Sequence, residues 1–241
     1  MRSPQITSQQ NSKLKEIRKL RQRRRWRERT GSFVAEGEDL LAAADAAGWE
    51  PVERYCASGS GLGGTEVDAQ LLARASGLAS GTRALAVDEE RWAQVLTGPL
   101  WLYLHGVQDP GNVGTILRSA EAWGASGVAL GPATADPFSP KAVRASMGAV
   151  FTVPLGKADD LASLPGLKIA LVPGRGTPLP DLARAQEAVT LLLGAERQGL
   201  PEAIVAQADA VAHIPIATDS LNVAMAATVA LYELTTRMAA R

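Results

Sequence analysis

Three segments carry the side chains best suited to chemistry, and the first two contain glycines. The first runs from Asp109 to Arg118 and reads DPGNVGTILR. Its glycines let a ligand approach the backbone closely. Asn112 and Arg118 lie six residues apart across a predicted helix start. We expect both side chains to point towards one pocket mouth, where an amide and a guanidinium can bind a polar or anionic substrate.

The other two segments follow later in the chain. Residues 193–199 read LGAERQG, and turn formation alone explains poorly why Glu196 lies between two glycines. Residues 213–224 read HIPIATDSLNVA and lead into the last helix. Ser220 is suited to cap that helix, which leaves Asn222 inside the first turn in need of a polar partner. Taken singly, each segment is also consistent with an ordinary turn or helix cap.

A parallel β-sheet is predicted to position these segments. Short, continuous apolar runs are typical of parallel strands that are buried on both faces, and they alternate here with helical stretches. The runs are 101–107, 128–130, 168–172 and 189–193, and the helical stretches are 113–123, 140–147 and 220–238. Residues 98–241 therefore read as a doubly wound α/β domain, in which ligands bind outside the carboxyl ends of the strands.

Residues 1–97 are predicted to form a separate, smaller α/β domain. Strand-like residues 33–37 precede a helical stretch at 38–47, and a second strand at 54–57 precedes a glycine-rich loop and a helix at 67–75. Turn residues at Thr97–Pro99 mark the boundary. Leu14, Ile17 and Leu20 at helical spacing indicate that the N-terminal segment docks through one apolar face.

Charge is distributed unevenly along a chain whose net charge is zero. The first 30 residues hold eleven Lys and Arg against two acidic residues. Arg23, Arg24 and Arg25 adjoin Trp26, which combines cations for a phosphate backbone with a ring that can stack on a base. This pattern favours RNA as a partner. The alternative is a solvated basic helix or a disordered arm without a partner.

Composition limits the class of protein to which this chain can belong. The 241 residues are 46% hydrophobic and 21% charged, a globular balance, and no apolar stretch is long enough for a membrane span. No apolar stretch of a secretory signal follows the N-terminus, and the single Cys56 cannot form an internal disulfide, so we expect a cytoplasmic protein. His105 and His213 lie in apolar strands and read as core residues, and no metal site is expected.

Taken together and in this order, the three segments resemble the motifs of the SpoU (TrmH-type) RNA ribose methyltransferases of the SPOUT superfamily. The resemblance rests on NxGxxxR from Asn112 to Arg118, GxExxG from Gly194 to Gly199, and SLNV from Ser220, and it spans residues 100–238. Residues 5–95 are similar to the ribosomal-protein-like substrate-binding domain that precedes many catalytic domains of the family.

The resemblance implies a parallel α/β domain with a C-terminal trefoil knot and S-adenosylmethionine bound among the knot loops. Family members work as homodimers in which both subunits contribute to the site. The positions that match cofactor-binding residues are Gly194, Glu196, Gly199, Ile214, Ile216 and Leu221. The positions that match catalytic residues are Asn112, Arg118, Glu196, Ser220 and Asn222. Family members commonly carry Ser at the fifth position of the third motif, where this chain has Ala224.

Two roles are open for Arg118. The family's arginine is often described as the base that deprotonates the ribose 2′-hydroxyl. Because a guanidinium keeps its proton in nearly every protein setting, we favour electrostatic stabilisation of the developing alkoxide and contact with the adjacent phosphate. In that role Asn112 and Glu196 would orient Arg118, and Ser220 and Asn222 would position substrate or cofactor.

The sequence therefore predicts S-adenosylmethionine-dependent 2′-O-methylation of RNA, ribosomal ahead of transfer RNA. A non-catalytic RNA-binding factor of the same fold is one alternative. A nucleotide-binding oxidoreductase is another, although the chain lacks the GxGxxG fingerprint. We expect the last helix to pair with a second copy through an apolar face made of Val223, Ala227, Ala230, Leu231 and Leu234.

Overall fold

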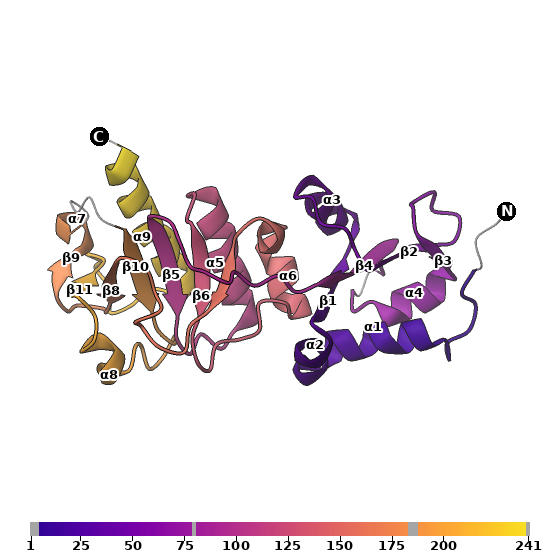
Figure 1. The fold of residues 1–241 in the computed structure, drawn as a ribbon, viewed down its shortest axis with the longest axis horizontal. Helices are drawn as coiled ribbons and strands as arrows, with labels where there is room; N and C mark the ends of the chain where they lie inside the picture. Colours follow the sequence, from indigo (N-terminus) through magenta and orange to yellow (C-terminus); the bar gives the residue numbers. More distant parts are fainter. Residues whose placement is uncertain (1–4, 79–80, 183–187, 240–241) are drawn as a thin grey trace.

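The computed structural model describes residues 5–78, 81–182 and 188–239 and shows an elongated molecule built around two β-sheets (Figure 1). The first sheet has the strand order β1-β4-β2-β3. Its elements are β1 (Ser32–Glu36), β2 (Glu53–Ala57), β3 (Thr65–Val67) and β4 (Ala84–Glu89), with helices α1 (Ser12–Gln22), α2 (Arg24–Thr30), α3 (Glu38–Ala46) and α4 (Ala69–Ala75). The sequence did not predict β3 or β4, because both are short or rich in alanine.

The basic N-terminal segment is folded as two helices and is not an extended arm. Asn11 caps α1 by accepting a hydrogen bond from the Lys13 N–H. Leu14, Ile17 and Leu20 are buried against the first sheet, which confirms the predicted docking face. The arginines of this segment are therefore held on a rigid surface.

The second sheet is parallel throughout and confirms the predicted fold class. Its strand order is β7-β6-β5-β10-β8-β11-β9. The strands are β5 (Leu100–Leu104), β6 (Gly127–Leu130), β7 (Leu155–Lys157), β8 (Leu167–Leu171), β9 (Thr177–Pro178), β10 (Val189–Leu193) and β11 (Ala210–His213). The helical elements are α5 (Pro110–Ala122), α6 (Pro140–Ser146), η1 (Ala149–Phe151), α7 (Leu179–Leu182), α8 (Glu202–Val205) and α9 (Val223–Ala239).

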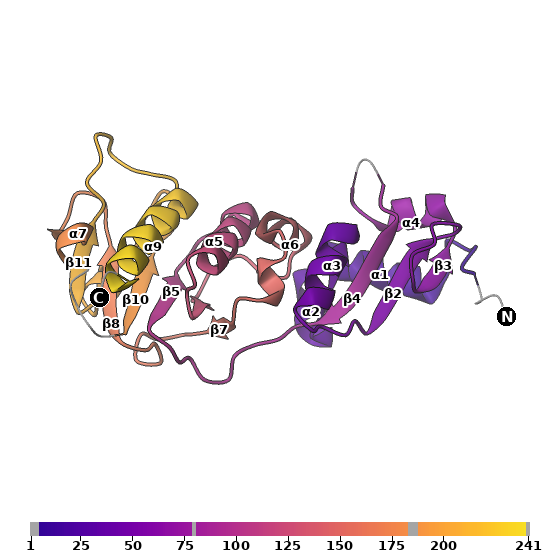
Figure 2. The same ribbon diagram turned by 90° about the horizontal axis from the view of Figure 1, so that it is seen from above.

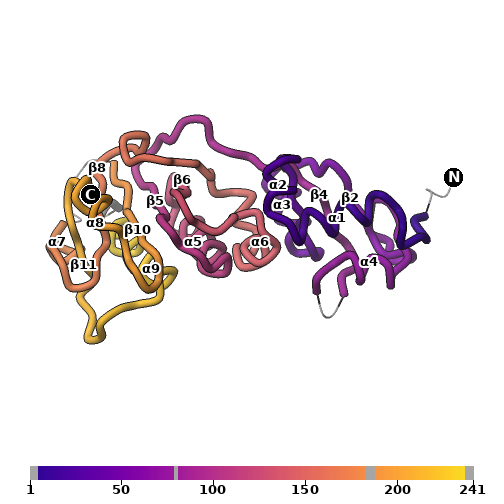
Figure 3. Tube along the Cα trace, turned by 90° about the horizontal axis from the view of Figure 1, so that it is seen from below, coloured from indigo at the N-terminus to yellow at the C-terminus, as the bar shows by residue number. Residues whose placement is uncertain are grey.

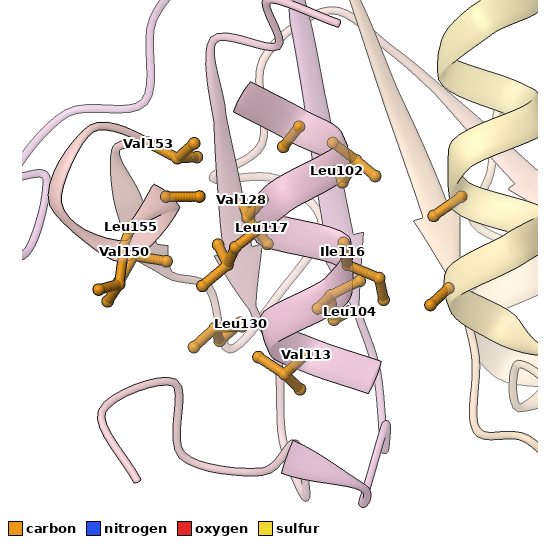
Figure 4. Close-up of a cluster of buried hydrophobic side chains, with 14 of the residues drawn as sticks. Leu102, Leu104, Val113, Ile116, Leu117, Val128, Leu130, Val150, Val153 and Leu155 are labelled. Atoms are coloured by element: carbon orange, nitrogen blue, oxygen red, sulfur yellow. The ribbon is translucent and has the colours of Figure 1, made fainter. Parts of the chain in front are cut away.

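Helix α5 packs along the sheet through one apolar face. Val113, Ile116 and Leu117 are fully buried and point towards side chains of β5 and β6 (Figure 4). Gly114 lies where α5 meets α6, and a Cβ there would lie 2.3 Å from the Ala142 carbonyl oxygen. The glycine of the first motif therefore permits close helix packing, which fixes the start of α5 relative to the sheet.

The two sheets share one apolar core. The rings of Phe33 and Trp49 from the first part pack with Phe138 and Phe151 from the second, and the Trp49 indole donates a 2.8 Å hydrogen bond to the Phe151 carbonyl. The linker from β4 to β5 runs along one side of the molecule (Figures 2 and 3). Because the shared rings are buried, the two parts are held in a fixed relative position.

Buried ion pairs reinforce this junction. Arg27 of α2 is 4% exposed and forms a 2.7 Å ion pair with Asp136 of the second part. The buried Glu36 carboxylate pairs with Arg21 at 2.5 Å and with Arg144 at 3.1 Å. Removing one partner of such a pair would leave an uncompensated buried charge, so the pairs that cross the junction, Arg27–Asp136 and Arg144–Glu36, specify how the two parts dock.

The predicted pairing face of α9 is wrong. Val223, Ala227, Ala230, Leu231 and Leu234 are 7% exposed or less and belong to the chain's own core. The opposite side of α9 instead exposes Met225 (62%), Val229 (38%) and Tyr232 (49%), which follow one another at helical spacing.

Among the helices that the structure describes, none has the length and apolar character of a membrane-spanning segment.

One buried carboxyl group lacks a hydrogen-bond partner. Asp88 of β4 is fully buried, and neither of its oxygens accepts a hydrogen bond. Burial raises the pKa of Asp88 to about 6, although the cations of Arg54 and Arg91 oppose the shift. The folded protein therefore binds this proton more tightly than the unfolded chain does.

We expect the Asp88→Asn variant to change how stability depends on pH. Between pH 3.8 and about 6 the folded state keeps a proton that the unfolded state has lost, so the free energy of unfolding falls as pH rises through this window. The substitution should remove that fall, worth about 3 kcal/mol at most, and should stabilise the protein at pH 7. Urea unfolding of the full chain between pH 4 and 7 measures this. An Asp39→Asn variant, changed at an exposed position, is the control, and equal pH dependence in both variants would contradict the assignment.

Candidate active site

A chain of side-chain hydrogen bonds joins the three predicted segments. The Asn222 amide nitrogen donates to the Asn112 side-chain oxygen at 3.2 Å. The Asn112 amide nitrogen in turn donates to Oε1 of Glu196 at 2.7 Å. These residues come from the start of α9, the start of α5 and the loop after β10, so elements far apart in sequence meet at one edge of the sheet.

The groups at the two ends of this hydrogen-bond chain fix its donor-to-acceptor direction. Asn222 Oδ1 accepts hydrogen bonds from the backbone N–H groups of Ala224 (2.9 Å) and Met225 (3.3 Å), so the amide nitrogen must face Asn112. At the other end a carboxylate can only accept. Asn222 is thus the N-terminal cap of α9, and the expectation that Ser220 fills this role is wrong, because α9 begins at Val223.

Asp109 fixes the start of α5 and hence the position of Asn112. Its Oδ1 accepts from the Gly111 N–H at 2.7 Å and from the Lys141 ammonium at 2.7 Å. The bond from Lys141 holds the pKa of Asp109 below its usual range. Sequence reasoning did not identify Lys141, since only folding brings α6 beside this loop.

A pocket of about 420 Å³ opens next to Glu196 at the carboxyl ends of β8 and β10. It is lined by the residues predicted to bind a cofactor, Gly194, Glu196, Gly199, Ile214, Ile216 and Leu221, and also by Ser220. Apolar Leu171, Val172 and Leu193 also line it, as do the charged residues Arg175, Arg197 and Glu202. The loop from β11 to α9, which projects from the sheet, contributes one side (Figures 2 and 3).

The turn from Gly194 to Gly199 shapes this pocket. The backbones of Ala195 and Gly199 pair with each other, and a Cβ on Gly194 would lie 2.2 Å from the Gly199 carbonyl carbon. Gly199 has φ +67°, a conformation that favours glycine. Both glycines are therefore required for a tight turn that presents Glu196.

Within one copy of the protein, Arg118 forms no hydrogen bond or ion pair with Asn112 or Glu196. Both Asn112 and Arg118 lie on α5, and six residues of helix place them roughly 120° apart around the axis. The Arg118 side chain is exposed, with no hydrogen bond or ion pair to any part of the chain that the structure describes. The expectation that both side chains point to one pocket mouth is therefore wrong for a single chain.

Much of the basic segment is engaged within the protein. Arg24 bonds to Glu28 at 2.8 Å and to the Thr134 carbonyl at 3.2 Å. The Trp26 ring contacts Lys19 (4.1 Å) and Arg29 (3.7 Å), and its N–H donates to Glu16. Arg23 and Arg25 are exposed, and no side-chain contact to the described residues occupies them.

Other reactive residue types do not form a second centre. Cys56 is buried. His105 contacts the Tyr103 hydroxyl at 3.2 Å, and burial lowers the pKa of His105. His213 Nδ1 is buried without a hydrogen-bond partner. Among residues 5–78, 81–182 and 188–239, no cluster of His, Cys, Asp and Glu could hold a metal ion.

Both parts of the chain match known protein families. Residues 99–232 match the SpoU rRNA methylase family model, and residues 11–95 match the MRM3-like substrate-binding domain. A 23S rRNA (guanosine(2553)-2′-O)-methyltransferase, RlmP, from Bacillus subtilis is 30% identical over 95% of this chain and 98% of its own length.

Solved structures agree with the sequence match. An AdoMet-bound rRNA methyltransferase from Sinorhizobium meliloti has a TM-score of 0.86 at 32% identity, with 98% of each chain covered. The SpoU methyltransferase AviRb from Streptomyces viridochromogenes, in complex with AdoMet, has a TM-score of 0.83 at 25% identity, with 95% of this chain and 98% of that chain covered. With both parts of the chain accounted for, this protein belongs to the SpoU rRNA methylase family.

Proposed function

We propose that this protein transfers a methyl group from S-adenosylmethionine to a ribose 2′-hydroxyl of ribosomal RNA in the cytoplasm. The observation that carries the proposal is the chain Asn222–Asn112–Glu196 at the mouth of the 420 Å³ pocket, within a fold of the SpoU rRNA methylase family. Residues 98–241 form the catalytic domain in this proposal, and residues 1–97 bind the RNA substrate.

The pocket suits S-adenosylmethionine in size and in chemistry. Apolar walls at Ile214 and Leu221 can enclose an adenine ring, and the close turn at Gly194–Gly199 exposes backbone groups for its polar edge. When bound, this cofactor supplies the methyl group from a sulfonium. We assign the knot implied by the family resemblance to the loops that line this pocket.

The chain's own residues align the acceptor and stabilise charge. Glu196 lines the cofactor pocket and is bonded to Asn112, so the two side chains connect the cofactor pocket with the start of α5. Asn222 and Ser220 position the ribose and cofactor from the side of α9. Such fixed side chains favour in-line transfer because the reacting groups lose less freedom in the transition state.

Arg118 completes this site from a second copy of the chain. Its exposed side chain lies on α5, which packs beside α9 through the 2.6 Å contact of the Ser119 and Thr228 hydroxyls, and α9 exposes the apolar stripe formed by Met225, Val229 and Tyr232. Pairing through this stripe would bury apolar surface and bring Arg118 of one subunit to the Asn112–Glu196 pair of the other. There the guanidinium would stabilise the developing alkoxide and contact a phosphate.

Methyl transfer to unmodified ribosomal RNA tests the proposed function. Tritium from labelled S-adenosylmethionine should enter the RNA as an alkali-resistant 2′-O-methyl mark. The Arg118→Ala variant should lose about 10²–10³-fold in turnover and keep its cofactor affinity, because Arg118 acts on charge that develops only in the transition state. Arg118→Lys should also stay well below wild type, since an ammonium cannot replace a planar fork.

Three other results would each change one part of the proposal: the substrate, the activity or the role of Arg118. Transfer to transfer RNA alone would change the substrate class. Binding of RNA and cofactor without transfer would indicate a non-catalytic factor. Full activity in Arg118→Ala would remove this residue from the mechanism.

The two-copy site predicts complementation between inactive variants. Sedimentation should show a dimer at micromolar concentration, and Met225→Glu with Tyr232→Glu should yield monomers because charge then replaces the apolar stripe. Val52→Glu, at an exposed apolar position just before β2, is the control. Mixing Arg118→Ala with Asn112→Ala subunits should restore activity, since each mixed dimer holds one intact site. No recovery in dimers shown to be mixed would mean that Arg118 acts within its own chain.

The basic segment predicts how salt affects RNA binding. Replacing Arg23 and Arg25 by Ala should flatten the dependence of log affinity on log salt by about 0.7–0.9 for each phosphate that the protein no longer neutralises. Cofactor affinity should stay constant. A variant with Arg74→Ala and Lys168→Ala, which removes two cations elsewhere, is the control measured in the same salt titration. Equal slopes in both variants would place the RNA surface away from α2.

A further inference from the structure

A second cavity lies at the junction of the two parts of the chain. It measures about 280 Å³ and shares no lining residue with the pocket beside Glu196. Its walls come from α2, from the linker between β4 and β5, from the loop after β6, and from the end of β7. The cavity therefore exists only in the docked arrangement of the two parts.

Its lining combines an aromatic ring with groups of both charges. The Lys157 ammonium lies 4.1 Å from the centroid of the Trp92 ring, and Phe138 packs against this ring edge-on at 5.3 Å. The Trp92 N–H donates to Oε2 of Glu90 at 3.0 Å. Burial raises the pKa of Glu90, as does the nearby Asp136. The half-buried Glu90 therefore offers a poorly hydrated acceptor beside a cationic donor.

The loop after β6 is held in a strained conformation at this cavity. Ala133 has φ +58°, which residues with a side chain seldom adopt. Thr134 fixes the loop because its hydroxyl donates to the Leu104 carbonyl at 2.7 Å and accepts from the Gly106 N–H at 3.2 Å. Strain that the surrounding structure maintains is typical of ligand sites.

The same loop connects the cavity with the candidate active site. The Ala135 N–H donates to the Val107 carbonyl, two residues before Asp109, which starts α5. Strands β5, β6 and β7 are parallel neighbours, so their carboxyl ends lie along one edge of the sheet. The cavity and the Asn112–Glu196 pair are therefore neighbouring positions on this edge.

We propose that the junction cavity binds one unpaired base of the substrate RNA, next to the nucleotide whose ribose is methylated. The inference rests on the proposed function. A nucleobase presents N–H donors for Glu90, acceptors for Lys157 and a flat face for Trp92, which is the usual chemistry of single-stranded RNA recognition. A bare phosphate fits poorly, because the carboxylates of Glu28, Glu90 and Asp159 also line the cavity.

Ultraviolet cross-linking to unmodified 23S rRNA tests this site directly. Nucleotide-bearing peptides, identified by mass spectrometry, should include the one that contains Trp92. The signal should fall in a variant that combines Glu90→Gln with Lys157→Ala. Gln keeps an acceptor for the Trp92 N–H, and Lys157 is exposed, so neither change leaves a gap in the core.

Kinetics of the same variant provide a second measurement. The KM for RNA should rise by about tenfold, the loss of roughly one charged hydrogen bond, with kcat and cofactor affinity within twofold of wild type. Glu66→Gln with Lys168→Ala is the matched control, since both are remote from the cavity. The proposal is overturned if Trp92 gains no nucleotide or if both variants have the same KM. A wild-type protein that transfers no methyl group would overturn the proposed function instead, while cross-linking, which needs no transfer, still tests the cavity.

Discussion

The directed hydrogen-bond chain from Asn222 through Asn112 to Glu196 is the interaction on which the candidate site depends. Each amide has one orientation that satisfies both neighbours, because backbone N–H groups bind one end and a carboxylate the other. The chain therefore does more than hold three loops together. It fixes which polar atom each of the three segments presents.

The junction of the two parts fixes the basic segment relative to this hydrogen-bond chain. Arg27 carries one of the charges that the sequence suggests for nucleic acid, yet it is buried against Asp136. A basic run can thus serve two purposes at once. Its inward arginines set the position of α2 on the second part, and its outward Arg23 and Arg25 are then presented at a defined place relative to the pocket.

The sequence predicted what depends on local pattern and missed what depends on tertiary contact. Apolar runs located β5, β6, β8 and β10, and the family resemblance pointed to six of the residues that line the pocket. The prediction that the inward face of α9 pairs with a second copy was wrong, because periodicity shows that a helix has an apolar face but not which partner covers it. Likewise, nothing in the spacing of Asp109 and Lys141 indicates that they meet, and the junction cavity is made of segments too dispersed to form a motif.

The departure at Ala224 is accounted for by the same hydrogen-bond chain. Family members commonly carry Ser at this position, but here the Ala224 side chain is 3% exposed, and its backbone N–H is what binds Asn222. The cap of α9 thus needs no hydroxyl at this residue. On the next turn Thr228 donates to the Ala224 carbonyl at 2.8 Å and contacts Ser119 of α5, so hydroxyl groups still join the two helices. Ala at this position therefore leaves the link between Asn222 and Asn112 intact.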